Sequence, residues 1–374
     1  MESFPPAVPD SQNPSRNETQ NESRVAENWP QTPQFSATIE TSSTRSEVET
    51  PQVAAVSPTQ IVRELAERLR HEVGKAVVGQ DEIITQFLVA ILVRGHVLLE
   101  GVPGIAKTLT AKSMAHVLSA TFKRVQFTPD LMPADVVGTN VFDGRTSEFS
   151  LRRGPIFTDM LLADEINRTP PKTQAALLEA MQERRATIDG ESHILSPMFT
   201  VFATQNPIDY EGTYPLPEAQ LDRFTLKVLM DYPNEEEESA LLARVHRGFD
   251  AHQLADAGLQ PVIDSEGLEA CRRAVEGVTI GEGMVKYITT IVRRTRDLPT
   301  LTLGASPRAS IALLQCAKAF AALNGRDFVI PEDVKTVALP VLRHRVLVRA
   351  EAEMEGTRPD AIVRGVLDSI EVPR

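Results

Sequence analysis

Apolar residues recur along most of the chain at two spacings, one typical of helices and one of buried strands. From Pro58 the spacing is helical through Ile61, Leu65 and Leu69, and a second helical run leads from Ile83 to Ile91. Four short apolar runs alternate with helical segments, and each predicts a strand. Because these strands alternate with helices, they predict a mostly parallel sheet covered on both faces. The predicted strands are residues 97–99, 124–127, 160–163 and 199–203.

The pattern changes after Tyr232-Pro233-Asn234 and becomes almost purely helical. We therefore expect an α/β core over residues 57–232 and a separate all-helical domain over residues 233–374. The helices predicted in the second domain cover residues 265–278, 282–297, 306–323 and 331–345.

Residues 1–56 show neither spacing and are rich in Ser, Thr, Pro, Gln, Asn and Glu. A segment with so few large apolar residues cannot bury enough surface to order itself, which predicts a disordered acidic tail. A docking arm for a partner and a solubilising leader both fit this composition.

Composition narrows the class of protein. The chain has 374 residues, 42% of them hydrophobic, which suits two or three domains with real cores. Cys271 and Cys316 are too few and too far apart for a disulfide framework or a zinc cluster, so we expect a reducing cytoplasmic setting. No apolar run approaches the length of a membrane span. The net charge of −12 weighs against tight nucleic-acid binding.

The strongest candidate for chemistry is the segment Glu100–Thr108, which directly follows the first predicted strand and opens a helix. Glycines allow backbone N–H groups to turn onto phosphate oxygens, while Lys107 reaches the β- and γ-phosphates and the Thr108 hydroxyl can bind Mg²⁺. Ala106 stands where the general Gly-x-x-x-x-Gly-Lys-Thr pattern has glycine. The alternative is an ordinary Gly/Pro turn before a helix.

Polar residues follow two later predicted strands. Asp164 and Glu165 end the third, where Asp164 would hold Mg²⁺ through a water and Glu165 would orient or deprotonate the attacking water. Asn206 ends the fourth and could polarise the same water. Arg223 and Arg308 lie at a helix end and a helix start; an exposed, solvated side chain is the alternative for both.

These motifs occur in an order that resembles the AAA+ ATPases, and in particular the MoxR family. The resemblance covers nearly everything from residue 60 to residue 374. It is carried by Val78-Gly79-Gln80, Gly101–Thr108, the segment Asp164–Glu183, Ala203–Pro207, Tyr214–Phe224 and Gly304–Arg308.

The resemblance implies a P-loop NTPase fold: an αβα AAA+ core followed by a helical lid, with ATP and Mg²⁺ as cofactors. It makes Glu165, Asn206, Arg223 and Arg308 catalytic, with Asn206 the first sensor and Arg308 the second, and Thr108 and Asp164 the metal ligands. Arg223 would enter a neighbouring subunit's site, with Arg184 and Arg185 as rivals, so that hydrolysis needs a ring, expected to be a homo-hexamer. The expected nucleotide contacts are Val78, Gly79, Gln80, Gly101, Val102, Pro103, Gly104, Ile105, Ala106, Lys107, Thr108 and Leu109.

Two inserts also fit the resemblance. Residues 129–154, containing Asp143-Gly144-Arg145, predict a loop or hairpin that interrupts a helix, and residues 186–195 predict a hairpin around Asp189-Gly190. In ring ATPases such hairpins can face the pore or the client; the alternative is that they only cap the sheet.

The function expected from the resemblance is ATP-driven, chaperone-like remodelling or maturation of a partner complex, often one with a von Willebrand A domain or a metal cofactor. The alternatives are a magnesium-chelatase-like motor subunit, a DNA-directed motor and an ATP-gated adaptor without turnover. The acidic balance disfavours the DNA motor.

Overall fold

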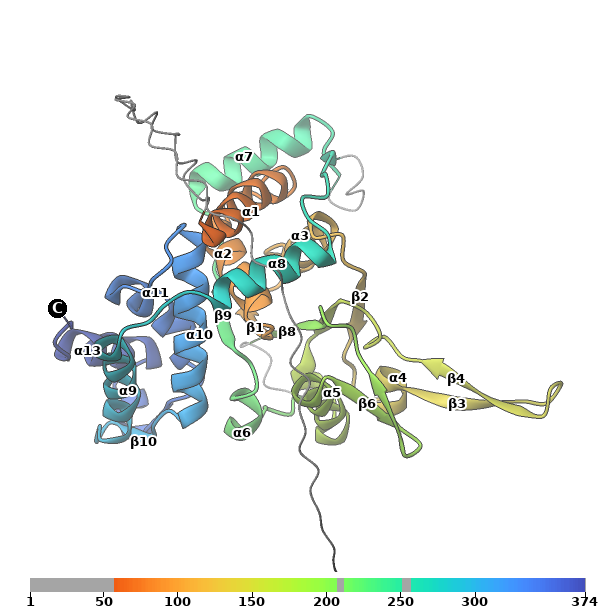
Figure 1. Cartoon of the computed structure of the whole chain (residues 1–374). Helices are drawn as coiled ribbons and strands as arrows, with labels where there is room; N and C mark the ends of the chain where they lie inside the picture. Colours follow the sequence, from red (N-terminus) through yellow and green to blue (C-terminus); the bar gives the residue numbers. More distant parts are fainter. Residues whose placement is uncertain (1–56, 207–211, 251–256, 374) are drawn as a thin grey trace, which may run out of the picture. The chain divides into compact units, whose positions relative to one another are not determined.

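The computed structural model describes residues 57–206, 212–250 and 257–373, so the predicted tail over residues 1–56 lies outside the described residues. Its centre is a parallel five-stranded sheet with the strand order β2-β5-β8-β1-β9 (Figure 1). The parallel sheet is confirmed, but the fifth strand, β9, was missed. The strands are β1 (Val97–Gly101), β2 (Phe122–Gln126), β5 (Met160–Asp164), β8 (Thr200–Gln205) and β9 (Leu226–Met230).

Alternate residues of the central strands enter two separate hydrophobic clusters. Leu98 and Leu161 pack towards α5 (Pro171–Glu183), whereas Leu99 and Leu162 pack towards the helices on the other face. This division is what a pleated strand buried on both sides requires. The helices of the second face are α1 (Pro58–Val73), α2 (Asp81–Leu92) and α3 (Lys107–Val117).

Helix α1 begins at the predicted position, because the Ser57 side chain accepts a hydrogen bond from the backbone N–H of Thr59 and Pro58 occupies the first turn. Leu65 and Leu69 are buried, as expected, but the first predicted position of the buried face is wrong. Ile61 is 43% exposed, whereas Val62 is completely buried.

The C-terminal region is mainly helical, as predicted, with a small addition. Strands β10 (Leu301–Leu303) and β11 (Leu347–Val348) form an antiparallel ribbon, so the region is not all-helical. The predicted boundary at residue 233 stays a prediction; α8 packs against α1 and α2 of the α/β part. The helices are α7 (Glu235–His246), α8 (Ser265–Glu276), α9 (Glu282–Arg296), α10 (Pro307–Leu323), α11 (Pro331–Leu342), α12 (Ala350–Met354) and α13 (Pro359–Ser369).

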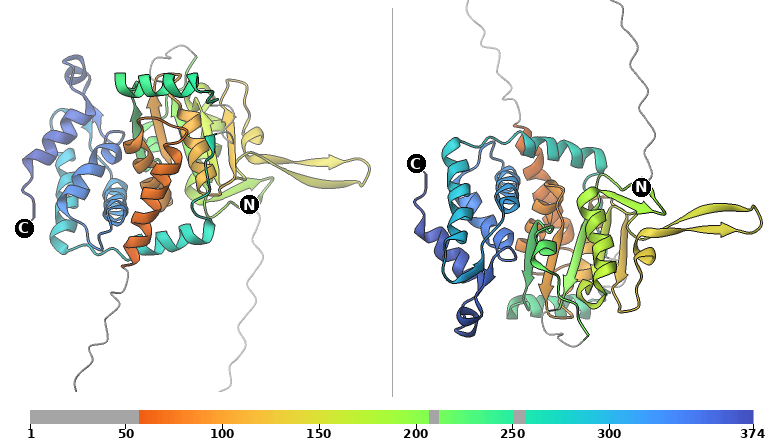
Figure 2. Two further views of the ribbon diagram at one scale, coloured as in Figure 1. Left: turned by 90° about the horizontal axis from the view of Figure 1, so that it is seen from above. Right: turned by 90° about the horizontal axis from the view of Figure 1, so that it is seen from below.

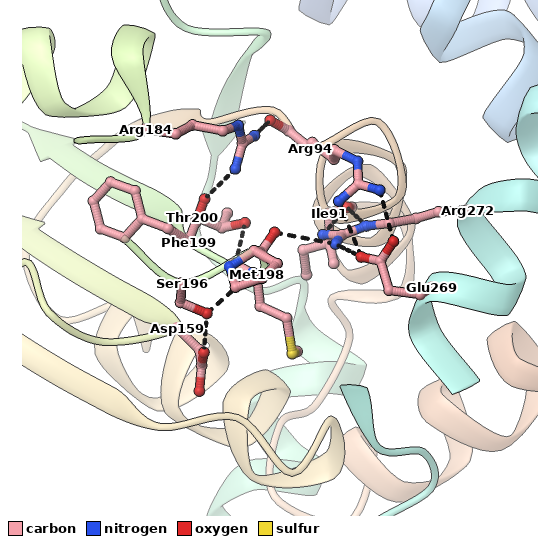
Figure 3. A network of polar contacts seen from close by, with 11 residues as sticks. Ile91, Arg94, Asp159, Arg184, Ser196, Met198, Phe199, Thr200, Glu269 and Arg272 are labelled. Carbon is pink, nitrogen blue, oxygen red and sulfur yellow. Dashed lines mark hydrogen bonds and ion pairs between the residues drawn. The ribbon is translucent and has the colours of Figure 1, made fainter. Parts of the chain in front are cut away.

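Three arginines and one glutamate fasten α8 to the amino-terminal edge of the sheet (Figure 3). The Glu269 carboxylate accepts hydrogen bonds from Nη1 and Nη2 of Arg94, at 3.0 and 2.6 Å, and also binds Arg272. Arg272 is 1% exposed and donates to the carbonyl of Ile91 at 2.8 and 3.1 Å. Arg184 donates to the carbonyls that precede β1 and β8.

Both predicted hairpins are confirmed, but the first does not interrupt a helix, because it lies between a five-residue helix and strand β5. The β3–β4 hairpin projects away from the α/β body (Figure 2) and follows the five-residue helix α4 (Pro133–Val137). Near its tip the rings of Phe142 and Phe149 are in contact, with their centroids 5.2 Å apart and their planes tilted by 56°, and both side chains are exposed. In the second hairpin, Asp189 and Gly190 both have positive φ, as a two-residue turn requires. The hairpin strands are β3 (Gly138–Asp143), β4 (Glu148–Arg153), β6 (Arg185–Ile188) and β7 (Glu191–Ile194).

Two short helices complete the described elements: the 3₁₀ helix η1 (Ile166–Arg168) and α6 (Glu218–Leu221). Within the described ranges, no helix has both the length and the apolar character needed to cross a bilayer.

A buried histidine makes the stability of the fold depend on pH. His96 accepts a hydrogen bond from the N–H of Val201 at Nδ1, so its Nε2 carries the proton that is donated to the carbonyl of Met181. Burial, reinforced by the charge of Arg184, lowers the pKa of His96 to about 3.

The imidazole of His96 therefore binds a proton near pH 6.5 in the unfolded chain but only near pH 3 in the folded chain. We expect this histidine to remove about 2 kcal/mol from the free energy of unfolding between pH 7 and pH 5, measured by urea titration. In His96→Asn the acceptor for Val201 remains, and this part of the pH slope should disappear. An unchanged slope in the variant would contradict the assignment; pH 7 against pH 8 serves as the reference interval.

Candidate active site

The segment between β1 and α3 forms the expected phosphate loop. Gly104 has φ +87°, and Ala106 has φ 64° and ψ 21°, in the left-handed region. The position where the general pattern has glycine therefore needs a positive φ. Alanine occupies it at a cost of about 1–2 kcal/mol, which explains how this chain departs from the pattern and still builds the loop.

Lys107 opens α3 and turns back over the loop, where its Nζ donates to the carbonyl of Gly101. Burial lowers the pKa of Lys107, whereas the charges of Asp164, Glu165 and Glu100 raise it. The ammonium thus lies at the positive end of a helix and close to two carboxylates, a setting in which it can bridge phosphate and protein charges.

The two predicted carboxylates lie at the carboxyl edge of the sheet. The Thr204 hydroxyl from the neighbouring strand donates to Asp164 Oδ1 at 2.5 Å and accepts from the N–H of Glu165 at 2.8 Å. Glu165 has φ 57° and ψ 50°, a strained conformation for a residue with a Cβ. The left-handed conformation turns the chain sharply at the end of β5, and the Glu165 side chain lines the cavity described below.

Side chains of β2 hold the same carboxylates, and these residues were missed. Arg124 Nη2 lies 2.6 Å from Asp164 Oδ2, and Gln126 Nε2 donates to Glu165 Oε2 at 2.7 Å. Arg168 Nε lies 3.1 Å from the same Glu165 oxygen. The available signal was the spacing of residues 124 and 126, which face the same side of a strand that pairs with β5.

A cavity of about 710 Å³ brings together two of the four predicted catalytic residues, Glu165 and Asn206, and both predicted metal ligands. Lys107, Thr108, Asp164, Glu165 and Asn206 all line it, together with Arg124 and Lys112. A hydroxyl and one or two carboxylates are the protein ligands that Mg²⁺ uses alongside phosphate oxygens, and the lysines match the phosphate charge. The residues present therefore fit a magnesium-bound triphosphate.

Val78, Gly79 and Gln80 line a second cavity of about 360 Å³, beside Tyr232 and Arg364. Gly79 has φ +72°, a backbone conformation that favours glycine, and a Cβ there would come within 2.1 Å of the flexible Glu237 side chain, which would have to move. Gln80 links this cavity to the phosphate loop, because it donates to the carbonyl of Ile105 at 3.1 Å and accepts from the Thr110 hydroxyl at 2.7 Å.

The predicted catalytic arginines are not in the larger cavity of this chain. Among the described residues, its lining includes neither Arg223 nor Arg308. Arg223 donates to the carbonyl of Leu178 at 2.8 Å, and Arg308 is exposed in the first turn of α10. The rivals also differ: Arg184 is held at the opposite edge of the sheet, and Arg185 is exposed at the start of β6.

A parallel sheet with a phosphate loop after one strand and paired carboxylates at the end of another defines a P-loop nucleotide-binding protein. Comparisons with known proteins give the family. Residues 96–226 match the ATPase family associated with various cellular activities (AAA), and residues 293–366 match the AAA lid domain. The chain belongs to the MoxR family of AAA+ ATPases.

Several relatives carry this conclusion. "Chaperone MoxR1" of Mycobacterium tuberculosis is 41% identical over 82% of this chain and 82% of its own length. "Uncharacterized protein YeaC" of Bacillus subtilis is 46% identical over 80% of this chain and 92% of its own length. The crystal structure of a candidate ATPase from Cytophaga hutchinsonii is 40% identical, with a TM-score of 0.78 over 85% of this chain and 97% of that one.

Proposed function

We propose that this protein binds and hydrolyses ATP with Mg²⁺. The observation that carries the proposal is the gathering of Lys107, Thr108, Asp164, Glu165 and Asn206 around one cavity. Thr108 and Asp164 would hold the metal, which supplies charge neutralisation at the phosphates when bound. Family membership and a relative described as a candidate ATPase support the same activity.

The chain's own residues supply the rest of the chemistry. Glu165 orients the attacking water and takes its proton, and Asn206 polarises that water. Gln126 and Arg168 keep the Glu165 carboxylate in one place, while Lys107 and the backbone N–H groups of the loop bind the phosphate oxygens. The smaller cavity at Val78–Gln80 receives the base, beside the phosphate loop to which Gln80 is bonded.

We further propose that the protein acts as a cytoplasmic homo-hexameric ring in which Arg223 completes the neighbouring subunit's site, assisted by Arg308 as the second sensor on the lid. Its task would be chaperone-like remodelling of a partner protein, of which one with a von Willebrand A domain is the expected kind. A relative named as a chaperone supports this role. The exposed Phe142–Phe149 pair supports client contact through the β3–β4 hairpin.

The test combines sedimentation velocity with steady-state ATP hydrolysis, with and without Mg·ATP. We expect turnover that requires Mg²⁺ and a ring that forms or tightens with nucleotide. Arg223→Ala and Lys107→Ala should each be inactive alone, and a mixture should regain part of the activity at mixed interfaces. A monomer that binds ATP without hydrolysing it would overturn the enzyme proposal and leave an adaptor.

A further inference from the structure

Three consecutive residues after α11 contact the backbone of β9 and of the turn between α6 and β9, which carries Arg223. Arg343 donates to the carbonyl of Lys227 at 3.2 Å. The His344 ring lies 2.9 Å from the carbonyl oxygen of Phe224. The backbone on the C-terminal side of Arg223 is therefore held by residues of the C-terminal helical region.

Arg345 makes the most extensive of these contacts. Its guanidinium donates to the carbonyl of Phe224 at 2.6 Å and to that of Thr225 at 3.0 Å. Its Nε lies 2.7 Å from Asp222 Oδ1, and the two side chains are only 3% and 16% exposed. A charged pair with so little water around it is stiff, because each partner would lose most of its solvation and its bond if it moved.

The second oxygen of the same carboxylate connects to another helix. Asp222 Oδ2 accepts from the Ser306 hydroxyl at 2.9 Å. Ser306 is also the N-cap of α10, where it accepts from the backbone N–H of Arg308 at 3.1 Å. The Asp222 carboxylate therefore connects the chain next to Arg223 to Ser306, the N-cap of α10, and α10 carries Arg308 in its first turn.

We propose that Asp222 is a positioning residue: through its bonds to Ser306 and Arg345, it makes the position of the Arg223 backbone depend on the position of α10. A displacement of α10 in one subunit would then shift the arginine presented to the next subunit. This inference rests on the proposed role of Arg223 in a neighbouring site. The side chain of Arg223 is tied separately, to the carbonyl of Leu178, so its backbone and its guanidinium are governed by different elements.

The experiment uses full-length subunits mixed in rings. The parent mixture joins Arg223→Ala subunits, which keep an intact phosphate loop, with Lys107→Ala subunits, which can only donate their arginine. Ser306→Gly is then added to one partner or to the other. Glycine is chosen because it is tolerated at an N-cap, so the helix start is disturbed little while the hydroxyl that reaches Asp222 is removed.

Ser306→Gly in the arginine donor should lower the regained ATP turnover by about tenfold or more, with the KM for ATP unchanged, because misplacing a positioned group lowers kcat. The donor subunit carries Lys107→Ala and hydrolyses no ATP itself, so a defect confined to the donor's own nucleotide site would not change the measured turnover. If the change has no effect in the donor and acts only in the partner with the intact loop, the positioning role is wrong. If the parent mixture regains nothing although both subunits co-assemble, the proposed trans role of Arg223 fails first.

Two further variants separate positioning from damage to the fold. Asp264→Gly in the donor removes a side-chain cap from α8, where Asp264 accepts from the N–H of Gly267 at 2.9 Å, and should leave the regained turnover intact. Asp222→Asn in the donor keeps the shape of the side chain and weakens both bonds, so it should reproduce the loss seen with Ser306→Gly. Thermal unfolding and co-sedimentation of each variant with its partner confirm that the subunits compared are folded and assembled.

Discussion

Glu165→Gln should lower ATP turnover by about 10²–10⁴-fold while leaving ATP bound, since an amide cannot take a proton from water but occupies the same space. The amide also keeps an oxygen that can accept from Gln126, which now holds the carboxylate at 2.7 Å. The left-handed turn at Glu165 is a backbone property and should survive the change. Single-turnover hydrolysis and equilibrium binding of a fluorescent ATP analogue measure the two effects separately.

Lys107→Ala provides the complementary loss, because it removes the ammonium from the phosphate loop and should weaken ATP binding itself. Glu183→Gln is the matched control: an exposed glutamate at the end of α5, outside the lining of the 710 Å³ cavity. Normal turnover in both Glu165→Gln and Lys107→Ala would refute the site assignment. Loss of binding in Glu165→Gln would mean instead that this carboxylate organises the pocket.

The sequence predicts the centre of the sheet because its strands are buried on both faces and therefore apolar throughout. The edge strand β9 escapes this rule. Its burial alternates, with Lys227 and Leu229 facing outward between buried residues, and Lys227 forms a 2.7 Å ion pair with Glu100. A mixed pattern of five residues beside a turn is too short to distinguish from a loop without the neighbouring strand.

Part of the site was likewise predictable and part was not. The order of the motifs places Lys107, Asp164 and Asn206 at one sheet edge, since parallel strands deliver their carboxyl ends together. Arg124 could not be assigned in the same way, because its partner, Asp164, lies 40 residues away in the chain. Only the pairing of β2 with β5 brings them within hydrogen-bonding distance.

The position of α8 also depends on contacts that the local pattern does not contain. Its sequence period marks a buried face but does not say that Glu269 meets an arginine 175 residues earlier. We expect a measurable loss of stability when the charged cluster that results is broken.

Glu269→Ala should lower the free energy of unfolding by about 3 kcal/mol, measured by urea titration. The change leaves Arg272, 1% exposed, and the half-buried Arg184 with Arg94 and without the carboxylate that neutralises them. Breaking a buried pair costs about 3–5 kcal/mol; we take the lower value because Arg94 is 38% exposed and water screens its share. Glu276→Ala, on an exposed position of the same helix, should cost far less.

A second substitution tests whether the uncompensated charge causes this loss. Arg272→Met in the Glu269→Ala background replaces the buried guanidinium by an apolar side chain that can still fill the space between α8 and α2. The double variant should regain part of the stability, although the carbonyl of Ile91 keeps only its backbone donor, the N–H of Arg94, at 3.2 Å. Arg272→Met alone completes the comparison. If the losses of stability in Glu269→Ala and Arg272→Met add up to the loss in the double variant, the cost of Glu269→Ala comes from lost packing rather than from an uncompensated charge. The three arginines would then contribute to stability independently of one another.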